Sequence, residues 1–123
     1  MVCVEFVFVF VSFLMFFVYL LVVSLSVRQP VTLVIYDIRD DRLRFRVARF
    51  LHGLGLSRIQ KSAFVGVLSG GLRSELEAGL RRILFGKSMY NVQIYTLTPA
   101  AYENRVILSE GYVVEEEEPD FLI

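Results

Sequence analysis

Val31-Thr-Leu-Val-Ile-Tyr-Asp-Ile-Arg-Asp-Asp-Arg42 is the stretch of sequence that decides the fold. Residues 31–36 form a short apolar run rich in β-branched side chains, which predicts a buried strand. Asp40 or Asp41 follows as the N-cap of a helix, and the apolar spacing after it predicts that this helix lasts to about Leu51. The domain therefore begins with a strand followed directly by a helix.

The same alternation of strand and helix continues outward from this stretch. Residues 58–68 predict one bent strand or two short ones, with Gly66 as a candidate β-bulge. A second helix is expected from the turn at 69–71 to about Phe85, and residues 91–97 alternate as a half-buried strand. Residues 105–108 predict one more short strand. The fold class is α+β, a ferredoxin-like βαββαβ unit with an extra C-terminal strand.

The predicted fold leaves one face of its sheet without helices. Because both helices pack on the same face, the other face needs a cover, and a second copy of the chain is the simplest one. We therefore expect a homodimer. Phe64 and Tyr95 are predicted to lie in the core, since no aromatic motif of the kind that stacks RNA bases accompanies them.

Both ends of the chain differ from this domain, which is expected at residues 28–110. Residues 6–27 carry no charge and form an apolar N-terminal helix long enough to span a bilayer. Two explanations of residues 1–27 stay open: a single-pass anchor with a cytoplasmic C-terminus, or sequence upstream of the true start of a cytoplasmic protein. Residues 111–123, with five acids between 115 and 120, are expected to form a disordered acidic tail.

The charge of the chain is unevenly distributed. The 13 basic and 13 acidic residues balance, but all 13 bases lie between Arg28 and Val114 beside only seven acids, so this region carries +6. Such a basic surface is typical of proteins that bind phosphate backbones of RNA or double-stranded DNA. The candidate nucleic-acid-binding residues cluster around the first helix and second strand: Arg39, Arg42, Arg44, Arg46, Arg49, Arg58 and Lys61.

Several classes of active site are excluded by composition. One cysteine and one histidine supply neither a disulfide within the chain nor a four-ligand zinc site. The single histidine, His52, falls in the last turn of the first helix, where a structural role is expected. Neither a dinucleotide-binding glycine motif nor a Walker sequence occurs.

Asp37 is the candidate catalytic and metal-binding residue. It ends the first buried strand, where sites in α/β layers often open, although a turn residue bonding its own backbone would occupy the same place. Mg²⁺ commonly takes one or two carboxylates together with waters and substrate phosphates. One Asp37 per chain is too little for a cage, so two copies would have to meet across a dimer axis.

Three motifs in this order carry a family resemblance: Val34-Ile-Tyr-Asp-Ile-Arg-Asp-Asp-Arg42, Arg58-Ile-Gln-Lys-Ser-Ala-Phe64 and Val92-Gln-Ile-Tyr-Thr-Leu97. Together they resemble the small CRISPR-associated protein two family, the companion of the CRISPR integrase. The resemblance implies a ferredoxin-like homodimer whose last strand packs on the partner's sheet. It also implies a Mg²⁺-dependent endonuclease for RNA or double-stranded DNA, with Asp37 of each subunit as metal ligand, that takes part in spacer acquisition.

A second function class fits the same surface. A non-catalytic dimer could grip a DNA duplex with its arginines and bridge integrase dimers. The two hypotheses separate at Asp37, which the enzyme needs and the scaffold does not.

Overall fold

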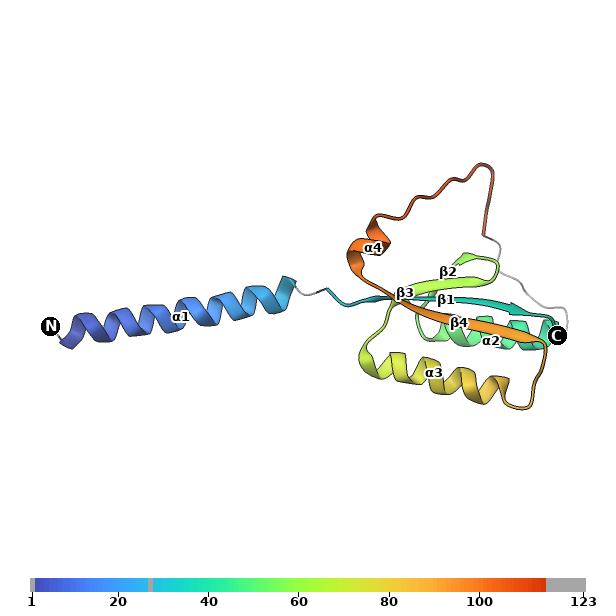
Figure 1. Ribbon diagram of the computed structural model, residues 1–123, viewed down its shortest axis with the longest axis horizontal. Coiled ribbons are helices and arrows are strands. Elements are labelled where there is room, and N and C mark those ends of the chain that lie inside the picture. Colours follow the sequence, from blue (N-terminus) through green and yellow to red (C-terminus); the bar gives the residue numbers. More distant parts are fainter. Residues whose placement is uncertain (1, 27, 115–123) are drawn as a thin grey trace.

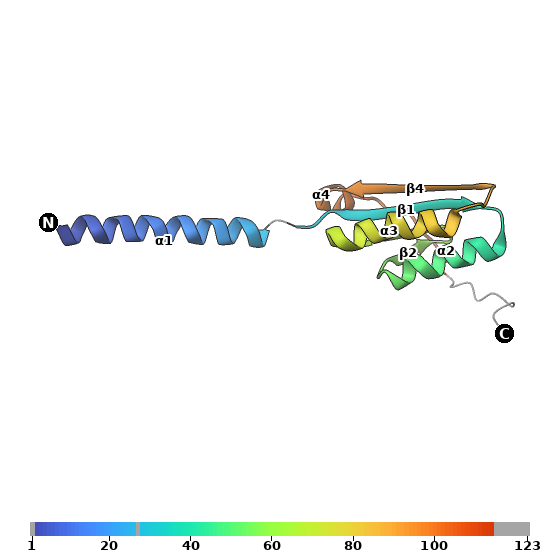
Figure 2. The ribbon, with the colours of Figure 1, turned by 90° about the horizontal axis from the view of Figure 1, so that it is seen from below.

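The computed structural model describes residues 2–26 and 28–114, with side chains for 7–22 and 28–114. The elements in chain order are α1 (Val2–Ser26), β1 (Val31–Ile38), α2 (Asp41–Gly53), β2 (Ser57–Gln60), β3 (Ala63–Val67), α3 (Gly70–Leu84), β4 (Tyr90–Leu97) and α4 (Pro99–Glu103). Figure 1 shows α2 and α3 side by side against one face of the sheet, and Figure 2 shows the same face from below.

The four strands form one antiparallel sheet in the order β2-β3-β1-β4. β1 lies in the interior of the sheet and pairs along its whole length with β4, from Val31↔Leu97 to Ile38↔Tyr90. On its other side it pairs with β3, from Val31↔Val67 to Ile35↔Ala63. This order, with α2 and α3 on one face of the sheet, confirms the ferredoxin-like fold.

The core lies between the sheet and the two helices. Successive side chains of a strand point to opposite faces, so Val34, Tyr36 and Ile38 of β1 enter the same layer, where all three are buried. The helices contribute their apolar stripes to this layer: Leu43, Val47 and Leu51 from α2, and Leu76, Leu80 and Leu84 from α3. Thr32 also points this way, since its Oγ1 accepts a hydrogen bond from Arg73 of α3.

Asp40 and Ser69 are the N-caps of α2 and α3. The Leu43 backbone N–H donates to Asp40 Oδ1 at 2.8 Å, and Leu72 N–H donates to Ser69 Oγ at 3.3 Å. The predicted cap at Asp40 is thus confirmed. Each such cap satisfies a backbone donor that the first turn of a helix leaves without a partner.

Two expectations about local structure are wrong. Residues 105–108 form no strand within the described chain, because the helix α4 directs this segment away from the sheet (Figure 1). The irregular register lies in β2 between Arg58 and Gln60, whereas Gly66 pairs regularly with Thr32. Gly66 instead allows a close approach, because a Cβ there would come within 2.8 Å of the Leu56 side chain and would force it to shift.

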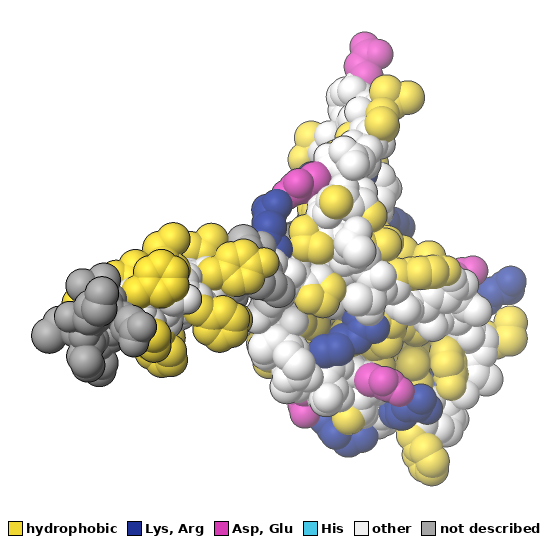
Figure 3. All heavy atoms as spheres, turned by 60° about the vertical axis from the view of Figure 1, so that its left-hand side comes forward, with side chains coloured by type: hydrophobic (Ala, Val, Ile, Leu, Met, Phe, Trp, Pro, Cys, Tyr) yellow, Lys and Arg dark blue, Asp and Glu magenta, His cyan; other side chains and the backbone are white. Residues whose placement is uncertain are grey.

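α1 stands apart from the domain in both ribbon views (Figures 1 and 2). All of its described side chains, 7–22, are exposed, and Figure 3 shows them as a nearly continuous apolar surface. Among the residues whose side chains the structure describes, 7–22 and 28–114, no helix is both long and apolar enough to cross a membrane. The acidic stretch 115–120 lies outside the described residues.

The contact between α2 and α3 provides a test of the fold. A Cβ at Gly79 in α3 would overlap the ring of Phe50 in α2, whereas a Cβ at Gly71 in the same helix meets nothing within 4 Å. Relieving such an overlap costs about 1–3 kcal/mol, while replacing glycine by alanine in a helix gains about 1 kcal/mol. Gly79→Ala should therefore be less stable than the matched control Gly71→Ala by at least about 1 kcal/mol. Urea unfolding measures the difference, and equal midpoints would contradict this packing.

Candidate nucleic-acid and metal site

The sheet face opposite α2 and α3, which we call the open face, carries Asp37. The residues of β1 between its core positions point there: half-buried Leu33 and Ile35, then exposed Asp37. The segment after α4 reaches the β2 side of this face, where the Tyr112 hydroxyl donates to Gln60 Oε1 at 3.2 Å. Asp37 itself remains exposed. The predicted position of this carboxylate at the end of the first strand is confirmed.

β4 places a row of polar side chains beside β1 on the open face. The register pairs Asp37 with Asn91, Ile35 with Gln93 and Leu33 with Tyr95. Within the row, Gln93 Nε2 donates to Asn91 Oδ1 at 2.9 Å, and the Tyr95 hydroxyl donates to Gln93 Oε1. The expectation that Tyr95 lies in the core is wrong, because Val92 and Ile94 take the core positions of β4. Phe64 is in the core as predicted.

A cationic groove of about 750 Å³ opens at the end of the sheet where β1 finishes. Its walls come from the start of α2 and from the loop between α3 and β4. Four basic side chains line it: Arg39, Arg42, Arg46 and Lys87. The one acid among its lining residues, Asp40, accepts the capping hydrogen bond from Leu43. The groove therefore presents a clear excess of positive charge.

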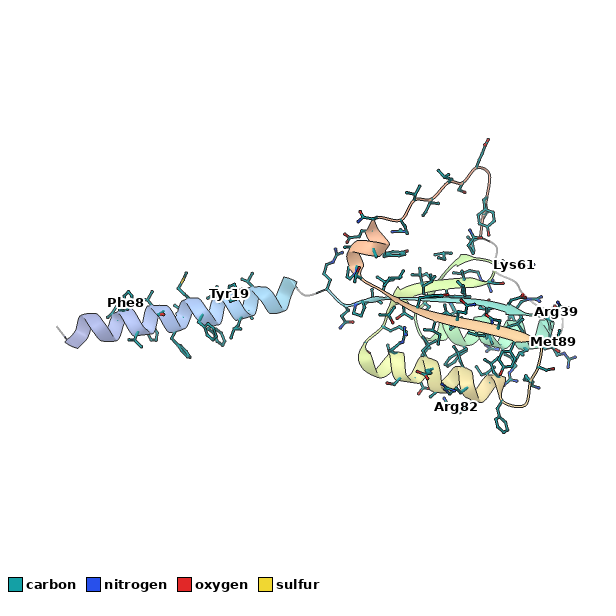
Figure 4. The ribbon with its side chains drawn as sticks, viewed as in Figure 1. Phe8, Tyr19, Arg39, Lys61, Arg82 and Met89 are labelled. Atoms are coloured by element: carbon teal, nitrogen blue, oxygen red, sulfur yellow. The ribbon has the colours of Figure 1, made fainter. Side chains whose placement is uncertain are left out.

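Backbone contacts fix the groove and Asp37 at the same end of the sheet. Arg39 N–H donates to Met89 O at 3.2 Å and extends the β1–β4 ladder past Ile38↔Tyr90. Arg39 is two residues beyond Asp37, and Met89 two residues before Asn91, so the rim of the groove adjoins the Asp37–Asn91 pair. Figure 4 shows Arg39 and Met89 together at this end, with Lys61 in the neighbouring hairpin and Arg82 on α3.

The structure brings together only part of the predicted basic cluster. Arg39, Arg42 and Arg46 share the groove, while Arg49 and Lys61 are exposed but do not line it. Two other predicted arginines are held within the fold. Arg44 pairs with Asp41 at 2.7 Å and donates to Ile38 O, and the Arg58 guanidinium lies 5.0 Å from the centre of the Phe64 ring.

Sequence reasoning missed Lys87. It follows Gly86, which ends α3, and it joins the groove because β4 runs back beside β1. The predicted ferredoxin-like fold contained the signal, because a last strand paired with the first makes the loop before β4 a neighbour of the residues after β1. Asn91, Gln93 and Tyr95 were likewise recognised only as strand residues.

The aromatic residues of two motifs meet in the core. The rings of Tyr36 and Phe64 stack with centroids 6.3 Å apart, and Arg58 covers the Phe64 ring. Tyr36 N–H also donates to Ser62 O at 3.0 Å, which holds the β2–β3 hairpin against the end of β1. Through these contacts the second motif holds β1, the strand that carries Asp37, in place.

Asp37 is the side chain at this site that could hold a hard cation. Nowhere among the described residues do three or more His, Cys, Asp or Glu side chains gather as a metal site. In a single chain the site offers one carboxylate, Asp37, and one adjacent amide, Asn91. These are too few to surround a metal ion with protein ligands alone, but Mg²⁺ accepts one or two carboxylates when water and phosphate complete its coordination shell. The donor type fits Mg²⁺, and Asp37 supplies one of the one or two carboxylates that this ion commonly takes.

Comparison with known proteins gives concordant results. The family model described as CRISPR associated protein Cas2 matches residues 31–105. "CRISPR-associated endoribonuclease Cas2" of Korarchaeum cryptofilum is 54% identical over 56 residues, which make up 46% of this chain and 60% of that protein. "CRISPR-associated endoribonuclease Cas2 2" of Chloroflexus aurantiacus is 41% identical over 80 residues, covering 65% of this chain and 93% of that protein.

A fused relative and a solved structure extend the comparison. The "CRISPR-associated endonuclease Cas1/endonuclease Cas2 fusion" of Thermoproteus tenax is 44% identical over 54 residues, 44% of this chain and 20% of the fusion. A crystal structure of Cas2 superposes with a TM-score of 0.55 at 29% identity, covering 72% of this chain and 98% of the other. The family match, which spans every strand of the sheet, shows that this chain belongs to the CRISPR-associated protein Cas2 family.

Proposed function

We propose that this protein is a Mg²⁺-dependent endonuclease that cleaves phosphodiester bonds of RNA as a homodimer and acts in CRISPR spacer acquisition. The observation that carries the proposal is the exposed Asp37 carboxylate at the end of β1, beside a groove lined by four cations. The names of the Cas2 relatives support endoribonuclease activity. Spacer acquisition would require the protein to work in the cytoplasm.

Two copies of Asp37, one from each subunit, would hold the metal. Bound there, Mg²⁺ would lower the pKa of a coordinated water and offset negative charge on the phosphate. Asp37 supplies carboxylate oxygens, and the groove cations Arg39, Arg42 and Arg46 hold the phosphate backbone on either side of the scissile bond. The reaction therefore requires the dimer, whereas binding of nucleic acid does not.

The proposed dimer is supported by apolar residues that are exposed in the single chain. Val106, Ile107 and Leu108 are 82%, 70% and 92% exposed, and Val67 at the end of β3 is 59% exposed. Figure 3 shows apolar side chains on the segment that projects from the domain. β4 is an edge strand with free backbone groups, so residues 105–108 of a second copy could extend the sheet there. The extra strand predicted from the sequence would then form only between subunits.

The second candidate function is binding of a DNA duplex without catalysis. It is favoured by the groove, whose cations bind phosphate without need of Asp37, and by the relative in which Cas1 and Cas2 are parts of one chain. In this alternative the dimer bridges copies of a CRISPR integrase and holds double-stranded DNA. The integrase is then the principal partner in both candidates.

The carboxylate separates the two candidates. Asp37→Asn preserves the shape of an exposed side chain and should lower metal-dependent RNA cleavage by more than about 100-fold, since even outer-shell partners of a metal contribute 10- to 100-fold. Labelled single-stranded RNA and duplex DNA are incubated with Mg²⁺ or EDTA, with Glu110→Gln as the control for another exposed acid. Cleavage that survives Asp37→Asn would contradict the proposed site, and duplex binding without any cleavage would favour the scaffold.

The groove makes a separate prediction about salt dependence. Each lost phosphate contact reduces the slope of log affinity against log salt by about 0.7–0.9, so Arg42→Gln with Arg46→Gln should reduce it by about 1–2. Arg81→Gln with Arg82→Gln is the matched control, because it removes the same charge from α3 at residues paired with Glu77 and Glu75. Fluorescence anisotropy of labelled RNA over a potassium chloride series measures both slopes. Equal slopes in the two variants would show that the groove is not the binding surface.

The dimer can be tested at an exposed position. Leu108→Asp should shift the protein from twice the chain mass to the single chain mass in sedimentation velocity, and cleavage should fall with it. Phe85→Asp is the matched control, since Phe85 is 86% exposed but caps α3 on the helix side of the sheet. A native chain that sediments as a monomer would contradict the shared site, as would a dimer that survives Leu108→Asp.

A further inference from the structure

We propose that the Asn91 side chain donates a hydrogen bond to a phosphate oxygen of the nucleic acid beside Asp37, and that Gln93 and Tyr95 hold its amide in the donating orientation. This inference rests on the proposed function, because it names a group that contacts the substrate at that same site. Asn91 is the substrate-contacting residue, and Gln93 and Tyr95 are positioning residues.

The direction of the hydrogen bonds along β4 is the first observation. The Tyr95 hydroxyl donates to Gln93 Oε1, and Gln93 Nε2 donates to Asn91 Oδ1 at 2.9 Å. Gln93 thus accepts a hydrogen bond at its amide oxygen and donates one from its nitrogen, and Asn91 accepts one at its oxygen. The hydrogen bonds of the three side chains therefore run in one direction along β4. The row ends on Asn91 Nδ2, which donates a hydrogen bond to no described residue. A donor is therefore held at the end of the row nearest Asp37.

The register of the sheet is the second observation. Asn91 is paired directly with Asp37, so their Cβ atoms lie about 5 Å apart on the same face. The residues opposite Gln93 and Tyr95 are Ile35 and Leu33, which offer no polar side-chain atom. The donor end therefore faces the one carboxylate in this stretch of β1, and the groove rim at Arg39 and Met89 begins two residues farther on.

The electrostatics explain why a donor is needed at this place. A phosphate that approaches Asp37 meets a like charge, which opposes binding unless cations and hydrogen-bond donors surround the anion. Arg39 supplies positive charge on one side. The Asn91 amide would supply a neutral donor on the other side, where it can align the phosphate without repelling a metal ion at Asp37.

A structural role of the row predicts something different. Asn91, Gln93 and Tyr95 are exposed, and hydrogen bonds between exposed side chains contribute little net stability because water competes for both partners. If the row only stiffened β4, its removal would change stability slightly and leave the contact with nucleic acid unchanged. A readout at the Asn91 amide itself distinguishes the two roles.

The chain is favourable for this measurement because it contains only two asparagines, Asn91 and Asn104, and three glutamines. The side-chain amide pairs of the ¹⁵N-labelled full chain are recorded by NMR during titration with a 12-nucleotide single-stranded RNA, in EDTA so that the RNA stays intact. Asn104, exposed at the end of α4, is the internal control. We expect the Asn91 pair to shift and the Asn104 pair to stay unchanged.

Three outcomes are distinguishable. A selective shift of Asn91 that Gln93→Leu reduces, and that Thr96→Val on the same strand does not, supports the inference. Backbone shifts at Arg39 and Arg42 with no change at Asn91 would overturn it while leaving nucleic-acid binding in place. If no resonance shifts, the proposed function fails together with the inference. Where the native chain cleaves RNA, Gln93→Leu should lower kcat/KM about 10-fold, and an equal effect of Thr96→Val would overturn the positioning role.

Discussion

The alternation of side chains along β1 is the constraint on which the rest of the structure depends. Because β1 lies between β3 and β4, one set of its residues must fill the core, and Val34, Tyr36 and Ile38 do so. The residue between Tyr36 and Ile38 is then forced onto the opposite face. Because of this period of two, Asp37 can be part of a regular strand and still be exposed to solvent. A shift of one residue in register would bury the carboxylate and expose the core.

The two parts of the proposed site, the cationic groove and the carboxylate, differ in whether one chain can form them. The cationic groove is formed within one chain, since α2 and the loop before β4 bring its four bases together. The proposed metal site would need a second chain, because β1 offers only one carboxylate, Asp37, to the open face. Binding of a phosphate backbone and its hydrolysis therefore make different demands on the protein. The family includes a protein named as an endoribonuclease and a chain in which Cas1 and Cas2 are fused. If binding and hydrolysis depend on different parts of the site, a member of the family could bind nucleic acid without cleaving it.

The elements predicted correctly from the sequence are those whose signals are local. Asp40 caps its helix through Leu43, and the apolar run 31–36 needs only its own composition to be recognised as a buried strand. The site needed more than local signals. Lys87 joins the groove only through the return of β4 beside β1, and Tyr95 leaves the core because Val92 and Ile94 fix the phase of its strand. Composition predicts Arg44 and Arg58 as phosphate ligands, but it could not show that Arg44 pairs with Asp41 or that Arg58 lies over the Phe64 ring. Residues 105–108 have the composition of a strand but no partner strand among the described residues of one chain.

The central claim is that one metal ion is shared by two copies of Asp37. Its most direct test is the stoichiometry of Mn²⁺ binding to the full chain, since Mn²⁺ takes the same hard oxygen ligands as Mg²⁺ and its free form is counted by electron paramagnetic resonance. The account predicts one bound ion per two chains, and loss of this binding in Asp37→Asn. One ion per chain, or binding that Asp37→Asn leaves intact, would contradict it.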